Sequence, residues 1–162
     1  MKIHVTGYGL ISSIGTNAEE SIESLRNLQT GIERGKSEAT KAYNLGAIHL
    51  SNDELKKRFD LKTDGSRTAL LGMVAAKQAF EGHELSENIR TGLISGTSVG
   101  GMDISEVEYK KYLDHDGHNP ENYKHHSSGT SSDQIANELG ISHFVNTIST
   151  ACSSAANALM MG

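Results

Sequence analysis

The chain of 162 residues contains one cysteine, one proline and no tryptophan, and aromatic residues make up only 5% of it. A single cysteine cannot form an internal disulfide, so a reducing, cytoplasmic compartment is the simplest expectation. No apolar run approaches the roughly 20 residues that cross a bilayer. The opening Met1-Lys2 leads into a short, interrupted apolar stretch that is unlike a secretory leader. We therefore expect neither a membrane protein nor a secreted one.

Positive charge is also scarce. Lysine and arginine number 15 against 20 acidic residues, which gives a formal net charge of −5. General nucleic-acid binding is not expected, because phosphate contacts need clustered basic side chains. Hydrophobic residues make up 36% of the chain and glycine adds 17 residues. Together they bring the apolar share near the ~45–50% of globular domains, so one folded domain over residues 1–162 is possible.

Apolar periodicity predicts an alternation of strands and helices. The expected strands are 3–14, 45–49, 91–97 and 143–149, and the expected helices are about 18–28, 51–59, 66–81, 106–113 and 133–139. Thr16 or Asn17 would cap the first helix, and Ser51 or Asn52 the second. Residues 30–41 and the polar segment before residue 133 are expected to be loops. Alternating strands and helices indicate a layered α/β sheet.

The single cysteine, Cys152, lies where a predicted strand meets a predicted helix. The run Phe144–Ile148 is apolar and β-branched, small residues follow it, and residues 152–160 indicate the first turns of a helix. A thiol there would face the positive end of the helix dipole and free N–H groups, which favour a thiolate and stabilise an oxyanion. Cys152 is therefore a candidate nucleophile, with a buried structural cysteine as the alternative.

Four segments together resemble the β-ketoacyl-acyl carrier protein synthases, condensing enzymes with a thiolase-like fold. Lys2–Gly15 is similar to that family's opening strand and turn, Ser66–Phe80 to its second major helix, Gly92–Gly101 to its next strand and glycine turn, and Phe144–Gly162 to its active-site signature. Their order and spacing agree from residue 2 to the end. The four linked motifs are much more specific than any one of them.

The resemblance implies a thiolase-like α/β/α fold and a two-stage reaction. Cys152 would take an acyl group from acyl carrier protein, and a carbanion from decarboxylated malonyl-acyl carrier protein would then attack the acyl-enzyme. No cofactor is implied beyond the phosphopantetheine of the carrier protein, and a homodimer or heterodimer is expected. Fatty-acid synthesis and polyketide or polyene synthesis both fit this chemistry.

The resemblance also implies residues outside this sequence. Family members are roughly twice as long or more and consist of two similar halves, with two catalytic histidines, a lysine and a further oxyanion donor in the second half. Residues 1–162 are therefore expected to be an N-terminal β-ketoacyl synthase domain, incomplete at the C-terminal end and inactive in condensation alone. Two alternatives stay open: a thiolase-fold acyltransferase of different chemistry, and a non-catalytic subunit of a condensing heterodimer, which usually lacks the cysteine.

Two glycine-rich stretches are similar to nucleotide-binding turns. Thr6–Ser12 follows a predicted strand but has Ser12 where G-x-G-x-x-G has its third glycine, and residues 96–101 are not followed by the lysine of a phosphate-binding loop. We expect the first to be a structural turn, and a nucleotide-binding module stays open as the alternative. The second is expected to let backbone pass close to the floor of the active site.

One polar segment is rich in histidine and aspartate, with His115, His118, His125, His126, Asp114 and Asp116. Their spacing matches no compact metal signature, so solvated surface is expected and adventitious metal binding is the alternative. The densest basic run consists of Lys56, Lys57, Arg58, Lys62 and Arg67. It is either a solvated helix face or, by regional resemblance to the family, a docking surface for the acidic carrier protein.

Overall fold

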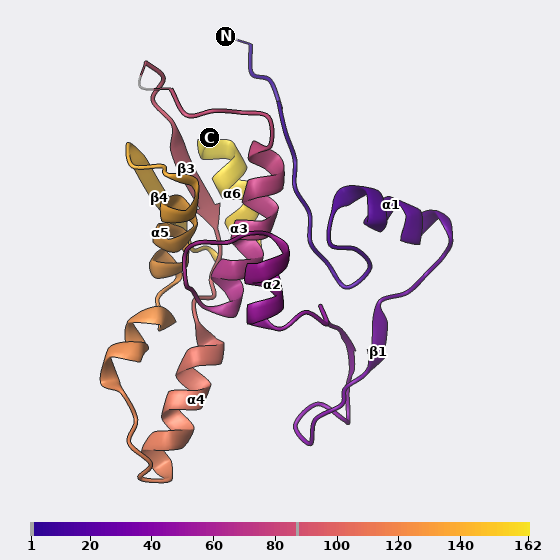
Figure 1. Cartoon of the computed structure of the whole chain (residues 1–162), viewed down its shortest axis with the longest axis vertical. Helices are drawn as coiled ribbons and strands as arrows, with labels where there is room; N and C mark the ends of the chain where they lie inside the picture. Colours follow the sequence, from indigo (N-terminus) through magenta and orange to yellow (C-terminus); the bar gives the residue numbers. More distant parts are fainter. Residues whose placement is uncertain (1, 87) are drawn as a thin grey trace.

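The computed structural model describes residues 2–86 and 88–162, and Figure 1 shows the arrangement of its elements. In chain order they are α1 (Ala18–Arg26), β1 (Ile32–Arg34), β2 (Asn44–Gly46), α2 (Asn52–Arg58), α3 (Arg67–Phe80), β3 (Gly92–Gly96), α4 (Met102–Leu113), the 3-10 helix η1 (Pro120–His126), α5 (Ser128–Leu139), β4 (Phe144–Ile148), the 3-10 turn η2 (Ala151–Ser153) and α6 (Ser154–Met161).

The centre of the fold is a parallel pair of strands covered by helices. β3 and β4 are in register from the pair Gly92–Phe144 to the pair Gly96–Ile148. α5 and α6 pack on these strands, and α3 packs on α5 (Figure 1). Parallel strands need such crossover helices, because a tight turn cannot connect them. The predicted α/β layers are confirmed, and so are the strands predicted at 91–97 and 143–149.

The hydrophobic core lies between α2, α3 and α5. Its fully buried members include Leu55, Leu70, Met73 and Val74, and Ile135 of α5 packs against them. Leu70, Met73 and Val74 are three and four residues apart, so they form one stripe along α3. Fully burying a side chain of this size stabilises the fold by roughly 1.5–3 kcal/mol. This core fixes α3 and α5, on which the central strands rest.

Helix ends follow the predicted capping residues. Asn17 caps α1, with its Oδ1 accepting the Glu20 N–H at 2.8 Å. Ser51 caps α2 in a capping box with Glu54, in which each side chain accepts the other residue's backbone N–H. Gly140 ends α5 in the left-handed region, with a φ of 70°, where glycine has no steric penalty.

The strand predicted over residues 3–14 is wrong. Residues 2–10 have no regular secondary structure, and the side chains of Ile3 and Val5 are 78% and 89% exposed. Alternating apolar residues predict a strand only where a neighbouring strand supplies hydrogen bonds, and among residues 2–86 and 88–162 β3 and β4 pair only with each other. Gly7 and Gly9 instead lie so close to α3 that an added Cβ would overlap the carbonyl oxygens of Ala79 and Ala75. Gly7 and Gly9 therefore allow residues 2–10 to pack closely against α3.

Four other parts of the structure differ from the prediction. The expected loop 30–41 contains β1, which pairs with β2 in antiparallel register, and β2 covers only the first part of the predicted strand 45–49 and starts one residue earlier. α4 begins at Met102, four residues before its predicted start. The polar segment before residue 133 is also not a loop, since it contains η1 and the start of α5.

A buried carboxylate explains why the histidine-rich segment is ordered. Glu108 of α4 is 3% exposed, and its oxygens accept the Asn119 N–H at 2.6 Å, the Asn122 side-chain amide at 3.0 Å and Lys111 Nζ at 3.0 Å. These hydrogen bonds lower the pKa of the Glu108 carboxyl from 4.5 to about 2, because each favours the charged form. Glu108 thereby ties η1 to α4. Across the described ranges, no helix is long and apolar enough to cross a membrane.

Candidate active site

Cys152 lies in a short turn between β4 and α6. β4 ends at Ile148, η2 covers Ala151–Ser153, and α6 begins at Ser154. The helix predicted to start at Cys152 therefore starts two residues later, because Ala151 has a φ of 51° and left-handed backbone cannot continue an α-helix. The structure leaves Cys152 exposed. The alternative of a buried structural cysteine is thus wrong.

The backbone of the turn is strained immediately before the thiol. A left-handed conformation costs an alanine about 1–2 kcal/mol, and it persists only where the surroundings hold it. The turn also places the Cys152 N–H at the start of a helical segment, where N–H groups have no intrahelical acceptor. Thiol and N–H are therefore presented together at the positive end of the α6 dipole.

Small polar side chains hold the turn from the helix side. Asn157 Nδ2 of α6 donates to Thr150 Oγ1 at 2.9 Å and to Ser153 Oγ at 3.3 Å. Ser153 Oγ in turn donates to the Thr150 carbonyl oxygen at 2.8 Å. These residues were missed by the sequence reasoning, although one signal existed: Ser153 and Asn157 are four residues apart and so share a helix face.

Gly96, at the end of β3, lets α6 approach the strands. A Cβ added at Gly96 would lie 2.6 Å from the Ser154 carbonyl oxygen and 2.7 Å from Ala155 Cα. The expectation that this glycine-rich stretch admits close backbone contact is borne out at Gly96. Gly100 and Gly101 approach a different segment, the backbone of His125–Ser127.

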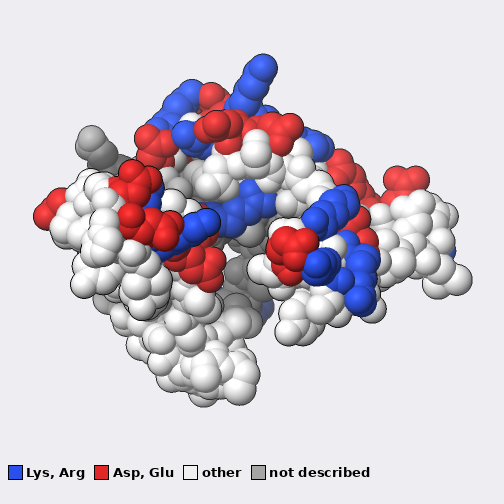
Figure 2. Space-filling model, turned by 90° about the horizontal axis from the view of Figure 1, so that it is seen from below, with Lys and Arg blue, Asp and Glu red and all other residues white. Residues whose placement is uncertain are grey.

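The basic run does not form an unpaired positive patch. Arg67 turns inward, and its guanidinium donates to the carbonyl oxygens of Ile48 and Leu50. Lys56 pairs with Asp64 at 2.8 Å and Arg58 pairs with Glu20 at 3.4 Å, while Lys62 pairs with Asp60. Figure 2 shows basic and acidic side chains interspersed on the face seen from below. This pairing favours the interpretation of a solvated helix face.

The histidine-rich segment does not gather into a metal site. His118 contacts the Tyr112 ring edge-on, with ring centroids 5.0 Å apart, and His125 Nδ1 lies 3.2 Å from Gln134 Nε2. Within residues 2–86 and 88–162, no group of three or more histidine, cysteine or acidic side chains could hold a metal ion. His118, His125 and His126 instead contact side chains of α4 or α5.

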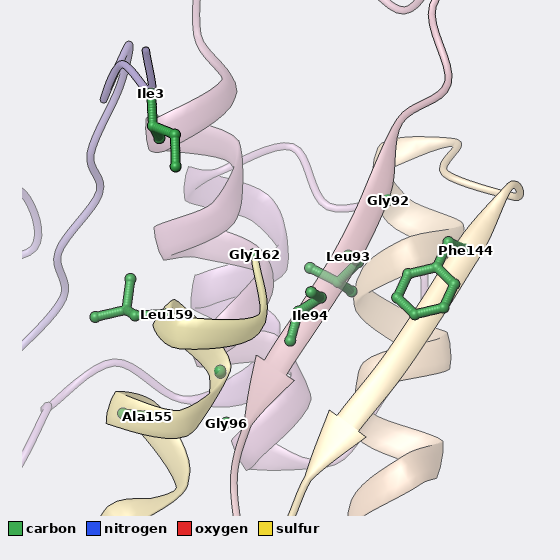
Figure 3. Close-up of a pocket in the computed structure, with 10 residues that line it drawn as sticks. Ile3, Gly92, Leu93, Ile94, Gly96, Phe144, Ala155, Leu159 and Gly162 are labelled. Carbon is green, nitrogen blue, oxygen red and sulfur yellow. The ribbon is translucent and has the colours of Figure 1, made fainter. Parts of the chain in front are cut away.

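An apolar groove of about 710 Å³ runs beside α6. Figure 3 shows α6 beside β3, with β4 on the other side of β3, and the labelled apolar residues Ile3, Leu93, Ile94, Phe144 and Leu159. Leu159 is 84% exposed and Phe144 is 51% exposed. Cys152 does not line this groove, so the thiol and the apolar surface lie on different parts of the same β4–α6 unit.

The family model of the beta-ketoacyl synthase N-terminal domain matches residues 1–162, so the chain belongs to the β-ketoacyl synthase family. The 3-oxoacyl-[acyl-carrier-protein] synthase 1 of Haemophilus influenzae is 35% identical over 59% of this chain and 25% of its own length. The corresponding synthase 2 of Staphylococcus aureus (strain MRSA252) is 26% identical over 70% of this chain and 29% of its own length.

A solved structure shares the fold. The ishigamide ketosynthase/chain length factor superposes with a TM-score of 0.69 at 23% identity, over 86% of this chain and 37% of that chain. The predicted family and the thiolase-like fold are confirmed. The matched region spans only 25% and 29% of the two curated relatives.

Proposed function

We propose that this chain is the nucleophile-bearing part of a β-ketoacyl-acyl carrier protein synthase, with Cys152 as the nucleophile. The observation that carries the proposal is the exposed thiol on the turn between β4 and α6, in a chain that matches the family over residues 1–162. Cys152 also lies immediately before α6, so its backbone N–H can serve an oxyanion that forms at the thiol.

The first stage transfers an acyl group to Cys152. The thiolate attacks the carbonyl carbon of an acyl thioester on acyl carrier protein, a new carbon–sulfur bond forms, and the bond to the carrier sulfur breaks. The carrier leaves as a thiolate, which takes up a proton. The negative charge that develops on the carbonyl oxygen would be held by the Cys152 N–H, since preorganised backbone donors stabilise such oxyanions.

The second stage forms the carbon–carbon bond. Malonyl-acyl carrier protein loses carbon dioxide, and the electron pair left on its α-carbon attacks the carbonyl carbon of acyl-Cys152. The Cys152 thiolate leaves, and the product is a β-ketoacyl thioester on the carrier. Fatty-acid synthesis and polyketide or polyene synthesis both use this condensation. We propose the condensation step and assign it to neither pathway.

The partners follow from this chemistry. Both curated relatives described above carry acyl carrier protein in their names, which supports the same partner here. The phosphopantetheine arm belongs to that carrier, and the reaction as written uses no metal or nucleotide. A thiolate nucleophile requires a reducing compartment, so we place the protein in the cytoplasm.

A homodimer or heterodimer is proposed as well. Exposed apolar side chains on β4 and α6, such as Phe144 and Leu159, support it, because contiguous apolar surface marks interaction sites. Sedimentation equilibrium over a concentration series tests this part of the proposal. A mass that stays monomeric at every concentration would count against a homodimer.

One stoichiometric measurement tests the acyl transfer. The purified chain mixed with acyl-acyl carrier protein should release one equivalent of carrier thiol per chain, because the chain has one cysteine. The Cys152→Ala variant should release none, while its melting temperature stays unchanged because the thiol is exposed. Absence of release from the unaltered chain, with Cys152 still open to alkylation, would refute the proposal.

The 162-residue chain is not expected to complete the second stage alone. By its resemblance to the family, decarboxylation needs two histidines and a lysine of a second half, which residues 1–162 do not include. Added malonyl-acyl carrier protein should therefore yield no β-ketoacyl product, as read by mass spectrometry of the carrier. Robust product from this chain would show that residues 1–162 suffice for decarboxylation.

A further inference from the structure

Ser154 is a buried hydroxyl two residues after the proposed nucleophile. It is the first residue of α6 and only 3% exposed. Its Oγ lies 2.9 Å from the Thr150 backbone nitrogen, 2.7 Å from the Ala151 carbonyl oxygen and 3.1 Å from Ser98 Oγ. Buried hydroxyls need partners, and two of the three partners of Ser154 are the two residues immediately before Cys152.

The direction of each bond follows from the one hydrogen that a serine hydroxyl carries. A carbonyl oxygen can only accept, so the Ser154 hydrogen goes to Ala151. The Thr150 N–H can only donate, so it takes one lone pair of Ser154 Oγ. Ser98 must then donate to the remaining lone pair. The one donor and both lone pairs of Ser154 Oγ are then used, so the hydroxyl hydrogen has a single orientation.

These bonds close a ring around Cys152. Thr150 and Ala151 precede the cysteine and Ser154 follows it, so the hydroxyl joins the two ends of the turn. Ala151 is the residue in the left-handed region, with a φ of 51°. Strained backbone of this kind relaxes unless its surroundings hold it. Ser154 supplies that hold through the carbonyl oxygen of the strained residue itself.

Ser98 ties the ring to the central strands. It lies two residues after β3, and its neighbour Thr97 donates its N–H to the Ile148 carbonyl oxygen at the end of β4, at 3.1 Å. Hydrogen bonds therefore connect the strands to Ser154 through the segment Thr97–Ser98. The position of the Cys152 turn relative to the sheet depends on it.

We propose that Ser154 is a positioning residue for Cys152 and that Ser98 supports it. This inference rests on the proposed function of Cys152 as acyl acceptor. Ser154 holds the turn so that the Cys152 N–H points to the place where the thioester oxygen becomes an oxyanion. Its role is thus in stabilising the acyl-transfer transition state, and Ser154 itself touches neither substrate nor thiol.

Two reactions of the same thiol separate this role from a merely structural one. Acyl transfer from a thioester passes through an oxyanion, whereas alkylation by iodoacetamide displaces iodide and forms none. Loss of the positioned N–H slows the first reaction and spares the second. Removing a single oxyanion donor in other enzymes costs about 10²–10³ in rate, and a displaced donor costs part of that.

The experiment compares both rate constants across variants of the 162-residue chain, with an acyl-pantetheine thioester as the acyl donor. Ser154→Ala should slow acylation by about tenfold to a hundredfold and change alkylation less than about twofold at each pH from 6 to 9. Ser154→Thr, which keeps the hydroxyl, should recover most of the loss. Ser98→Ala removes one hydrogen bond and should slow acylation by about two- to tenfold.

Ser149→Ala is the matched control, because it makes the same change just before the turn and the Ser149 hydroxyl has no hydrogen bond among the described residues. Equal acylation rates for Ser154→Ala and the unaltered chain would overturn the inference about Ser154 alone. An equal fall of both reactions, with a lowered melting temperature, would also overturn it. An unaltered chain that alkylates but does not acylate would overturn the proposed function and, with it, the role of Ser154.

Discussion

The core around α3 and the turn that carries Cys152 are held by different forces. Leu70 and Met73 are at most 1% exposed and pack on apolar neighbours from α2 and α5. Cys152 is exposed, and the residues on either side of it are joined by hydroxyl and amide hydrogen bonds. Burial thus fixes the scaffold, while a polar network fixes the reactive group.

The difference explains how a reactive thiol can be both accessible and fixed in position. Burying Cys152 would orient it but would close the path of an acyl group. An exposed residue on an apolar turn would be accessible but mobile. Hydrogen bonds from Thr150, Ser153 and Ser154 supply orientation without covering the thiol. We therefore expect substitutions in the two regions to separate stability from acyl transfer.

The largest expected effect is on stability. Leu70→Ala should lower the free energy of unfolding by about 2–5 kcal/mol, because the removed atoms leave a cavity in a close-packed core and Leu70 is 1% exposed. Urea unfolding followed by circular dichroism measures it. A loss below about 1 kcal/mol would contradict the view that burial at α3 holds the scaffold.

Gly96→Ala should act mainly on the chemistry. The added Cβ would meet the backbone of α6 at 2.6–2.7 Å, so the helix and the Cys152 turn must shift. Misplacement by about 1 Å can cost roughly 10² in rate, and we expect acylation of Cys152 to fall by about that factor. Thioester acylation rates measure it, with Gly129→Ala as a control, because a Cβ added at Gly129 of α5 has its nearest neighbour at 3.5 Å, an ordinary contact distance. Unchanged acylation would show that α6 need not approach β3.

The capped helices and the central strands were predictable because their signals are local. Ser51 lies three residues before Glu54, which is the spacing of a capping box, and short apolar runs indicated β3 and β4. The strand expected at 3–14 failed because a ladder partner cannot be read from the pattern of the strand itself. The same holds for η1, whose order depends on hydrogen bonds from Asn119 and Asn122 to Glu108.

The candidate site was predictable only in part. Cys152 was found from its place between a strand and small residues. Ser154 was not, because its partner Ser98 lies 56 residues away in the sequence and no local pattern joins the two. The left-handed Ala151 was equally hidden, since alanine rarely adopts that conformation. Positioning residues of this kind emerge only when the fold brings the segments together.

A pH dependence tests whether polar networks also hold segments away from the turn. The Glu108 carboxyl has its pKa lowered from 4.5 to about 2 in the fold, so between these values the unfolded chain binds more protons. Stability contributed by the Glu108 carboxylate is therefore complete above pH 4.5 and lost as pH falls toward 2. The melting temperature of Glu108→Gln should fall less steeply over this range than that of the unaltered chain. Parallel curves would contradict the role of Glu108.

The smallest expected effect on the free energy of unfolding comes from the same leucine-to-alanine change at the surface. Leu159→Ala should change the free energy of unfolding by less than about 0.5 kcal/mol, because Leu159 is 84% exposed. Urea unfolding of Leu159→Ala beside Leu70→Ala gives the contrast directly. A loss at Leu159 as large as that at Leu70 would mean that the groove beside α6 is filled in solution, as it would be in a homodimer.

The site of acylation tests the central claim most directly. The chain is incubated with acyl-acyl carrier protein, digested, and mapped by mass spectrometry before and after treatment with hydroxylamine, which cleaves thioesters. We predict the acyl group on the peptide that contains Cys152, removable by hydroxylamine and missing in Cys152→Ala. An acyl group on any other residue, or none on a Cys152 that iodoacetamide still alkylates, would contradict the account.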